Sequence, residues 1–217
     1  MTTTTTNLNV RQGVDLSALE TFAEHAATNP ADVQFEFEAV GEYEGRAAHT
    51  TTTTGPYTLG GQRIDRLARR YTRHYGAHKE VEEALGFVDP TDREEVIEAV
   101  LAALTGCINT AVSASALVRG IELDELTTEV SIAWDPFVFL HLADPLTDGA
   151  PTTQFRDLRV KITVAADGLT EEDLNYLRDS VNRSAVYNLV TTTNPTAPTI
   201  RTAEAGPPEP TRHAITA

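Results

Sequence analysis

The feature that most constrains this fold is a long apolar stretch in the middle of the sequence, Val96 to Val118. Thr91, followed by Glu94 three residues later, has the spacing of a capping box at a helix N-terminus. Gly120 stands where a helix C-cap commonly adopts a left-handed conformation. Apolar residues fall on nearly every face of the helix so delimited. We therefore predict a long, buried central helix.

Polar residues interrupt this stretch at Glu98, Thr105, Asn109 and Ser113, so we do not expect it to span a bilayer. The threonine-rich N-terminus lacks the basic start and apolar core of a secretory signal. We expect a cytoplasmic protein.

Composition excludes several classes of site. Cys107 is the single cysteine, which excludes an intramolecular disulfide and a cysteine-rich metal site, and we expect no cofactor. The 17 basic and 32 acidic residues give a net charge of -15, which opposes binding to nucleic acid or to anionic membranes. An acidic surface with lysine only at positions 79 and 161 is typical of a halophilic protein.

Hydrophobic periodicity predicts elements on both sides of the central helix. Before it we expect a helix over 15–27, a strand over 33–39 that returns through 46–54 as a hairpin, and a glycine-interrupted helix over 59–87. After it we expect strands over 126–134 and 155–165, a helix capped by Thr170 and Asp173, and an edge strand over 196–200.

This order predicts an α+β fold without alternating βαβ units. The low apolar content of both ends predicts a disordered threonine-rich tail over 1–12 and a disordered proline-rich tail over 202–217. One domain, with an N-terminal helical extension, is expected over 13–201.

The segment Glu98 to Cys107 resembles the cysteine-bearing helix of the OsmC/Ohr family, in which an acidic residue, an apolar run and Gly-Cys follow one another. The similarity continues in residues 119–121 and in 183–188, which resemble the end of that helix and the family's second helix. Residues 15–45 resemble an extended OsmC-like subgroup. The resemblance covers residues 14–200.

The resemblance implies an antiparallel sheet with long buried central helices, in two chains intertwined as a homodimer. It also implies an oxidative-stress function, in which a thiolate reduces an organic hydroperoxide and becomes a sulfenic acid. Only the thiolate is nucleophilic, so such a site needs hydrogen bonds or positive charge near the sulfur. Cys107 is the implied nucleophile.

The sequence departs from the family pattern at two positions. Ser184 stands where the family has its resolving cysteine, so the resemblance implies an external thiol reductant. Tyr43 stands where the family has its catalytic arginine, and Arg46 follows three residues later. Arg46 would supply positive charge, and Tyr43 would donate a hydrogen bond to the peroxide.

Glu98 matches the family residue that orients this arginine. Nine residues at ~100° each place Glu98 and Cys107 on opposite sides of a straight helix, about 13 Å apart along its axis. Glu98 would therefore act through an arginine or at the dimer partner. The resemblance implies an alkyl pocket lined by Val100, Ala103 and Leu104.

The residues alone leave other interpretations open. Cys107 also suits a small buried core residue, Arg46 a surface position on a strand, and Ser184 a helix cap. His74, His78 and Glu82 would share one face of a helix, but the pattern favours a solvated face over a metal site. The alternative function is a non-catalytic dimer that binds a hydrophobic ligand or partner.

Overall fold

The computed structural model describes residues 9–142, 154–192 and 198–200. Its order of helices and antiparallel strands confirms the predicted α+β class. The elements are β1 (Val10–Arg11), β2 (Val14–Asp15), α1 (Leu16–Thr28), β3 (Phe35–Tyr43), β4 (Thr50–Leu59), β5 (Gln62–Ile64), β6 (Tyr71–Tyr75), α2 (Lys79–Ala84), α3 (Val96–Arg119), β7 (Glu125–Trp134), β8 (Phe155–Ala165), α4 (Glu171–Asp179) and α5 (Ala185–Thr191).

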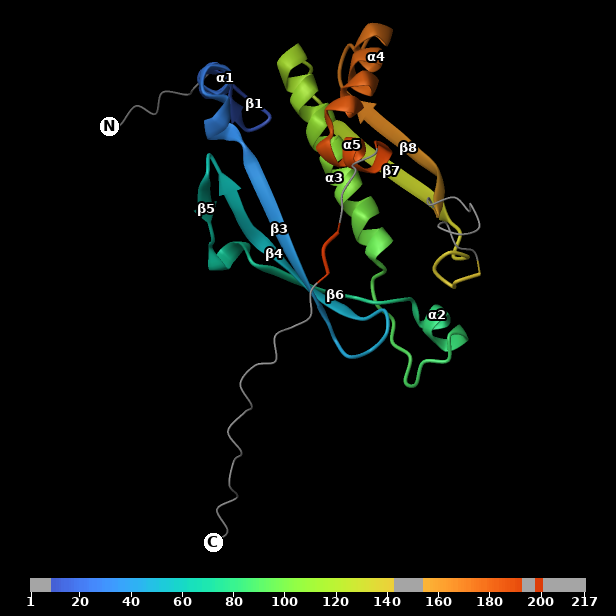
Figure 1. Ribbon diagram of the computed structural model, residues 1–217. Coiled ribbons are helices and arrows are strands. Elements are labelled where there is room, and N and C mark those ends of the chain that lie inside the picture. The colour runs from blue at the N-terminus through green and yellow to red at the C-terminus, as the bar shows by residue number, and fades with distance from the viewer. Residues whose placement is uncertain (1–8, 143–153, 193–197, 201–217) are drawn as a thin grey trace, which may run out of the picture.

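Helix α3 is the predicted central helix and lies between the two main sheets (Figure 1). It ends as expected at Gly120, whose φ of 78° closes the helix. Its start differs from the prediction: the capping box is formed by Glu95 and Glu98, not by Thr91 and Glu94. The Glu94 carbonyl accepts from the Gly76 amide, and this pairing keeps the chain extended up to the helix.

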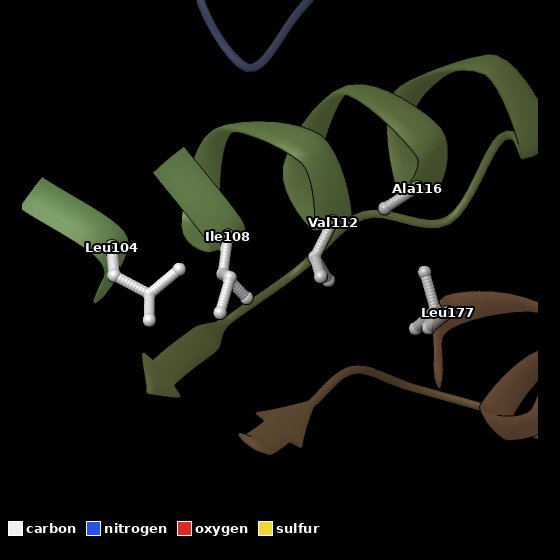
Figure 2. Close-up of a cluster of buried hydrophobic side chains, with 5 residues drawn as sticks. All are labelled: Leu104, Ile108, Val112, Ala116 and Leu177. Carbon is white, nitrogen blue, oxygen red and sulfur yellow. The ribbon is translucent and has the colours of Figure 1, made fainter. Parts of the chain in front are cut away.

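The core of the C-terminal half forms along one face of α3. Leu104, Ile108, Val112 and Ala116 recur every fourth residue, so they share one side of the helix. Figure 2 shows their side chains in a row, with Leu177 of α4 closing one end. They pack against apolar residues of β7 and β8.

The opposite face of α3 is exposed in the single chain. Its small residues are Ala102, Ala103, Gly106, Thr110 and Ala114. The prediction of a buried helix is therefore correct for one side only. The expectation that this stretch cannot span a bilayer was too strict. By length and composition alone, α3 could cross a membrane.

The N-terminal sheet consists of β3, β4, β5 and β6. Strands β3 and β4 form the predicted antiparallel hairpin, with Phe37 opposite Tyr57 and Tyr43 opposite Thr50. Every residue of β3 is exposed. The β3–β4 arm and the β7–β8 pair lie on different sides of α3 (Figure 1).

The predicted helix over 59–87 is wrong. Gly60 and Gly61 both have positive φ and form the turn between β4 and β5. Tyr71–Tyr75 then pairs along β4, and the helical parts are a 3-10 turn, Leu67–Arg69, and α2, Lys79–Ala84. The aromatic residues spaced like a helix stripe are thus partly strand residues, whose pairing overrides the local pattern.

The C-terminal elements follow the prediction closely. Strands β7 and β8 pair with Val130 opposite Val160, and Thr170 and Asp173 form the expected capping box of α4. A short 3-10 turn, Ser180–Arg183, separates α4 from α5. The predicted strand over 196–200 lies partly outside the described residues, and 198–200 have no regular structure. The predicted tails are also largely outside the described residues.

Candidate functional site

Cys107 lies half-buried on α3, against the first turn of α5. The first backbone N–H groups of a helix have no partner within the helix. Here the Val186 N–H points at the sulfur, with 3.5 Å between Val186 N and Cys107 Sγ. The start of α5 therefore offers hydrogen-bond donors to the thiol.

These donors change the acidity of Cys107. Burial raises the pKa of the Cys107 thiol, but hydrogen bonds from the Ser184 side chain and from the Val186 and Ala185 amides outweigh burial and lower the pKa. A lower pKa increases the fraction of thiolate, the nucleophilic form. The hydrogen bonds at the start of α5 thus outweigh the effect of burial on the Cys107 thiol.

Ser184 is the predicted site residue that helps to lower the pKa of Cys107, and it lies two residues before Val186, whose N–H donates to the sulfur. It is only 1% exposed and is the N-cap of α5, where its Oγ accepts from the Tyr187 N–H over 3.2 Å. Ser184 is therefore a helix cap, and its role as the former resolving position stays a prediction.

An apolar cleft of about 510 Å³ lies between α3, the β7–β8 pair and α5. The predicted residues Val100 and Leu104 line it, whereas Ala103 lies on the exposed face of α3. Leu104 is three residues before Cys107, and Val190 is four residues after Val186, so both walls continue about one helical turn towards the thiol. The other residues lining the cleft are Ile97, Leu101, Ile132, Phe155, Arg156, Asp157, Leu158 and Thr191.

Glu98 lies at the N-terminus of α3. Its carboxylate accepts from the Glu95 N–H over 2.8 Å and lies 3.2 Å from His78 Nε2. The Glu95 amide is the largest influence on the Glu98 pKa; burial opposes it and His78 assists it, and the net effect lowers the pKa. As the helical geometry required, these contacts do not include Cys107 of the same chain.

Tyr43 and Arg46 lie near the tip of the β3–β4 hairpin. Tyr43 is 70% exposed. One nitrogen of Arg46 donates to Glu82 Oε2 and to the Asp89 carbonyl over 3.1 and 3.0 Å, and its guanidinium lies over the Phe87 ring. Among the described contacts, neither residue touches Cys107.

The structure reveals a buried polar group that sequence reasoning missed. This Glu82 cluster contains Glu82, His49, Arg46 and Thr91. Glu82 is fully buried, with His49 Nε2 at 2.5 Å and the Thr91 N–H at 2.7 Å from its oxygens. Burial raises the Glu82 pKa, but hydrogen bonds from Thr91 and His49 outweigh it and lower the pKa to about 2.

The Glu82 cluster connects the tip of the β3–β4 hairpin to the segment that precedes α3. The sequence singled out Glu82 only as part of a predicted helix face with His74 and His78, and gave no sign that its side chain is buried. Glu82, His74 and His78 do not share a helix face: His74 pairs with Glu44, and His78 with Glu98. Within the part of the chain that the structure describes, no group of histidine, cysteine and acidic residues could hold a metal ion.

Residues 97–199 match the family described as OsmC-like protein. Among curated proteins the chain has no significant match. Solved structures similar to it include an OsmC-like protein from Mycoplasma pneumoniae (14% identity, 73% of this chain and 88% of that one, TM-score 0.45). Another is the organic hydroperoxide resistance protein OhrB of Bacillus subtilis, with 16% identity over 72% of this chain and 90% of that one and a TM-score of 0.40. A third is the organic hydroperoxide resistance protein OsmC from Legionella pneumophila, with 16% identity over 72% of this chain and 89% of that one and a TM-score of 0.42.

Proposed function

We propose that this chain, which belongs to the OsmC-like protein family over residues 97–199, reduces organic hydroperoxides with Cys107 as nucleophile and an external thiol as reductant. One observation carries the proposal: the Val186 N–H, in the first turn of α5, donates to the Cys107 sulfur over 3.5 Å, and the hydrogen bonds at this helix start lower the pKa of the thiol. The apolar cleft begins about one turn away.

In the proposed reaction, the Cys107 thiolate attacks the terminal oxygen of the hydroperoxide. The O–O bond breaks, the alcohol leaves after taking a proton from solvent, and Cys107 becomes a sulfenic acid. A first external thiol displaces water and forms a mixed disulfide. A second thiol releases Cys107 and leaves as the oxidised reductant. Ser184 cannot form a disulfide, so both reducing equivalents come from outside the chain, as in the reducing cytoplasm.

The apolar cleft would hold the organic part of the peroxide. Val100 and Leu104 would contact the alkyl or aryl group, and burial of that group favours an organic peroxide over hydrogen peroxide. Ala103 faces away from this cleft in the single chain. Any substrate contact of Ala103 would therefore arise at a subunit interface.

A homodimer would complete the proposed site. The exposed face of α3 and the fully exposed β3 are large uncovered surfaces, with Phe37 77% and Val118 73% exposed. In the dimer these surfaces would be covered, and Glu98, Arg46 or Tyr43 of the partner subunit would approach Cys107. The proposed roles of these three residues depend on that arrangement.

The test is peroxide consumption by the purified protein with a small dithiol as reductant. We expect Cys107-dependent turnover of cumene hydroperoxide, faster than that of hydrogen peroxide, and none in Cys107→Ser. Equal rates in the wild type and in Cys107→Ser would contradict the proposal.

A second candidate function is non-catalytic binding of a hydrophobic ligand. The apolar cleft favours it, as does the lack of a cationic side chain at Cys107 among the described contacts. This alternative predicts binding of a fluorescent fatty acid with the same affinity in the wild type and in Cys107→Ser. Binding would weaken in Val100→Phe, which fills the cleft.

A further inference from the structure

Asp157 of β8 has an unusual backbone conformation. Its φ is 56°, in the left-handed region that residues other than glycine seldom adopt. The register between β7 and β8 shifts at this point, so Ile132 faces two residues of β8, Asp157 and Leu158. An extra residue of this kind is a β-bulge, a feature that re-aims side chains and is common beside active sites. All three residues line the apolar cleft, so the irregularity lies at the candidate site.

Asp157 lies at the rim of the apolar cleft. It lines the cleft and is also exposed to solvent, as is its neighbour Arg156. Apart from Thr191, the other residues that line the cleft are apolar. A ligand that enters past this rim therefore meets the charges of residues 156 and 157 before it meets the apolar walls.

The balance of charge at this rim is negative. Arg156 Nη1 lies 3.7 Å from Asp135 Oδ2, so a carboxylate beside this arginine offsets its positive charge. Within residues 9–142, 154–192 and 198–200, the Asp157 side chain has no ion pair or hydrogen bond that would offset its own charge. One guanidinium and two carboxylates leave an excess of negative charge at the rim.

This charge affects which ligands can occupy the cleft. An anionic group at the rim would lose hydration and would meet the Asp157 carboxylate, and both effects oppose binding. An uncharged or cationic group avoids the repulsion. Like charges placed in this way are a common source of specificity. The net charge of -15 on the whole chain acts in the same direction.

We propose that Asp157 is a specificity-determining residue, which disfavours anionic ligands in the apolar cleft and favours uncharged or cationic ones. Its consequence for catalysis rests on the proposed function: the preferred substrates are then uncharged or cationic organic hydroperoxides, and carboxylated ones are poorer. The preference itself belongs to the cleft and is measurable by binding alone.

The binding experiment compares two fluorescent probes that differ only in charge, 1-anilinonaphthalene and its 8-sulfonate. Fluorescence titration of the full chain gives the dissociation constant of each probe. In Asp157→Asn, the affinity for the sulfonate relative to the uncharged probe should rise about threefold, because a like charge near the surface is removed. The gain should shrink as salt is raised, since salt screens exposed charges.

The variants are chosen so that loss of charge is separated from damage to the fold. Asparagine and glycine both tolerate a positive φ, so Asp157→Gly should give the same gain as Asp157→Asn. Asp167→Asn is the matched control, because it removes an exposed carboxylate beyond the other end of β8 and away from the cleft. It should not change the relative affinity. Val100→Phe, which fills the cleft, should weaken binding of the uncharged probe.

A kinetic experiment carries the inference to the reaction. The substrates are cumene hydroperoxide and its para-carboxylated derivative, which differ in charge but share the reacting group. In Asp157→Asn, the ratio of kcat/KM for the carboxylated peroxide to that for cumene hydroperoxide should rise about threefold.

A sulfonate probe that gains no relative affinity in either Asp157 variant, or gains as much in Asp167→Asn, would overturn the inference. So would binding of the uncharged probe that is unaffected by Val100→Phe. Failure of the proposed function has a different signature. The predicted shift in probe binding without peroxide turnover would remove the activity and keep the charge selection, whereas turnover without any shift would do the reverse.

Discussion

The Val186 amide lies 3.5 Å from Cys107 Sγ, although 79 residues separate the two in sequence. The contact joins the central helix α3 to the first turn of α5. It depends on the 3-10 turn between α4 and α5, because that turn redirects the chain so that a new helix starts beside the thiol. The nucleophile and its environment therefore come from distant parts of the chain.

The contact of Cys107 with the first turn of α5, which begins directly after Ser184, predicts that Ser184→Cys creates a disulfide. Treatment with cumene hydroperoxide should give a product whose mass is two hydrogen atoms below that of the reduced variant, and dithiothreitol should reverse the change. The reason is that the introduced thiol would lie beside the sulfenic acid and displace water from it. The control for position is the variant Val186→Cys, in which Ser184 is left unchanged. A Ser184→Cys variant that keeps two free thiols after oxidation would contradict the described contact.

The apolar cleft predicts that Val100→Phe reduces the use of bulky substrates. The larger ring would occupy the cleft, so kcat/KM for cumene hydroperoxide should fall roughly tenfold while that for hydrogen peroxide changes little. Steady-state kinetics with both peroxides check this. Ile200→Phe, at an exposed position outside α3, is the control and should leave the ratio of the two constants unchanged. A parallel loss for both peroxides would instead indicate damage to the fold.

The Glu82 cluster predicts acid-sensitive stability. The Glu82 pKa falls from 4.5 to about 2 on folding, so its contribution to stability is present above pH 4.5 and is lost as the pH falls towards 2. Denaturant unfolding should therefore show the wild type losing stability through this window. Glu82→Gln should be less stable than the wild type at pH 7, with a flatter dependence below pH 4.5.

Glu83→Gln is the matched control for this effect, because Glu83 is the next residue on α2 and its side chain is 54% exposed. Its denaturant unfolding curves should follow those of the wild type both at pH 7 and below pH 4.5. Identical behaviour of the two variants would show that burial of Glu82 has no energetic consequence.

The exposed surfaces of β3 and α3 predict a homodimer in solution. Sedimentation should give twice the mass of the 23.5 kDa chain. Phe37→Glu places a charge on the exposed aromatic surface of β3 and should shift the protein towards monomer, because burying an unpaired charge is costly. Ile200→Glu, at a fully exposed position near the end of the described chain, should not. A wild type that sediments as a monomer would remove the proposed roles of Glu98, Arg46 and Tyr43.

The sequence predicted those elements whose pattern is local. The end of α3 at Gly120, the alternation in β8 and the Thr170 and Asp173 cap are each defined by a local pattern, and each prediction was confirmed. The segment 59–87 was mispredicted because β6 is defined by pairing with β4, which no local period reveals.

The candidate site was less accessible from sequence than the fold. Pairing of Ser184 with Cys107 came from family resemblance, since nothing in spacing alone joins residues so far apart. The sequence grouped Glu82 with His74 and His78 and not with its true partners, because burial of one glutamate in an acidic helix depends on tertiary contacts with His49 and Arg46. The catalytic roles of Glu98, Arg46 and Tyr43 stay predictions.

The central claim is that Cys107 reacts with organic hydroperoxides, and trapping of its sulfenic acid tests this most directly. The pure protein, kept in high salt, is treated with stoichiometric cumene hydroperoxide and dimedone, and its intact mass is measured for the wild type and Cys107→Ser, with hydrogen peroxide for comparison. We predict one dimedone adduct in the wild type, formed faster with cumene hydroperoxide, and none in the variant. A wild-type thiol that stays unmodified would contradict the account.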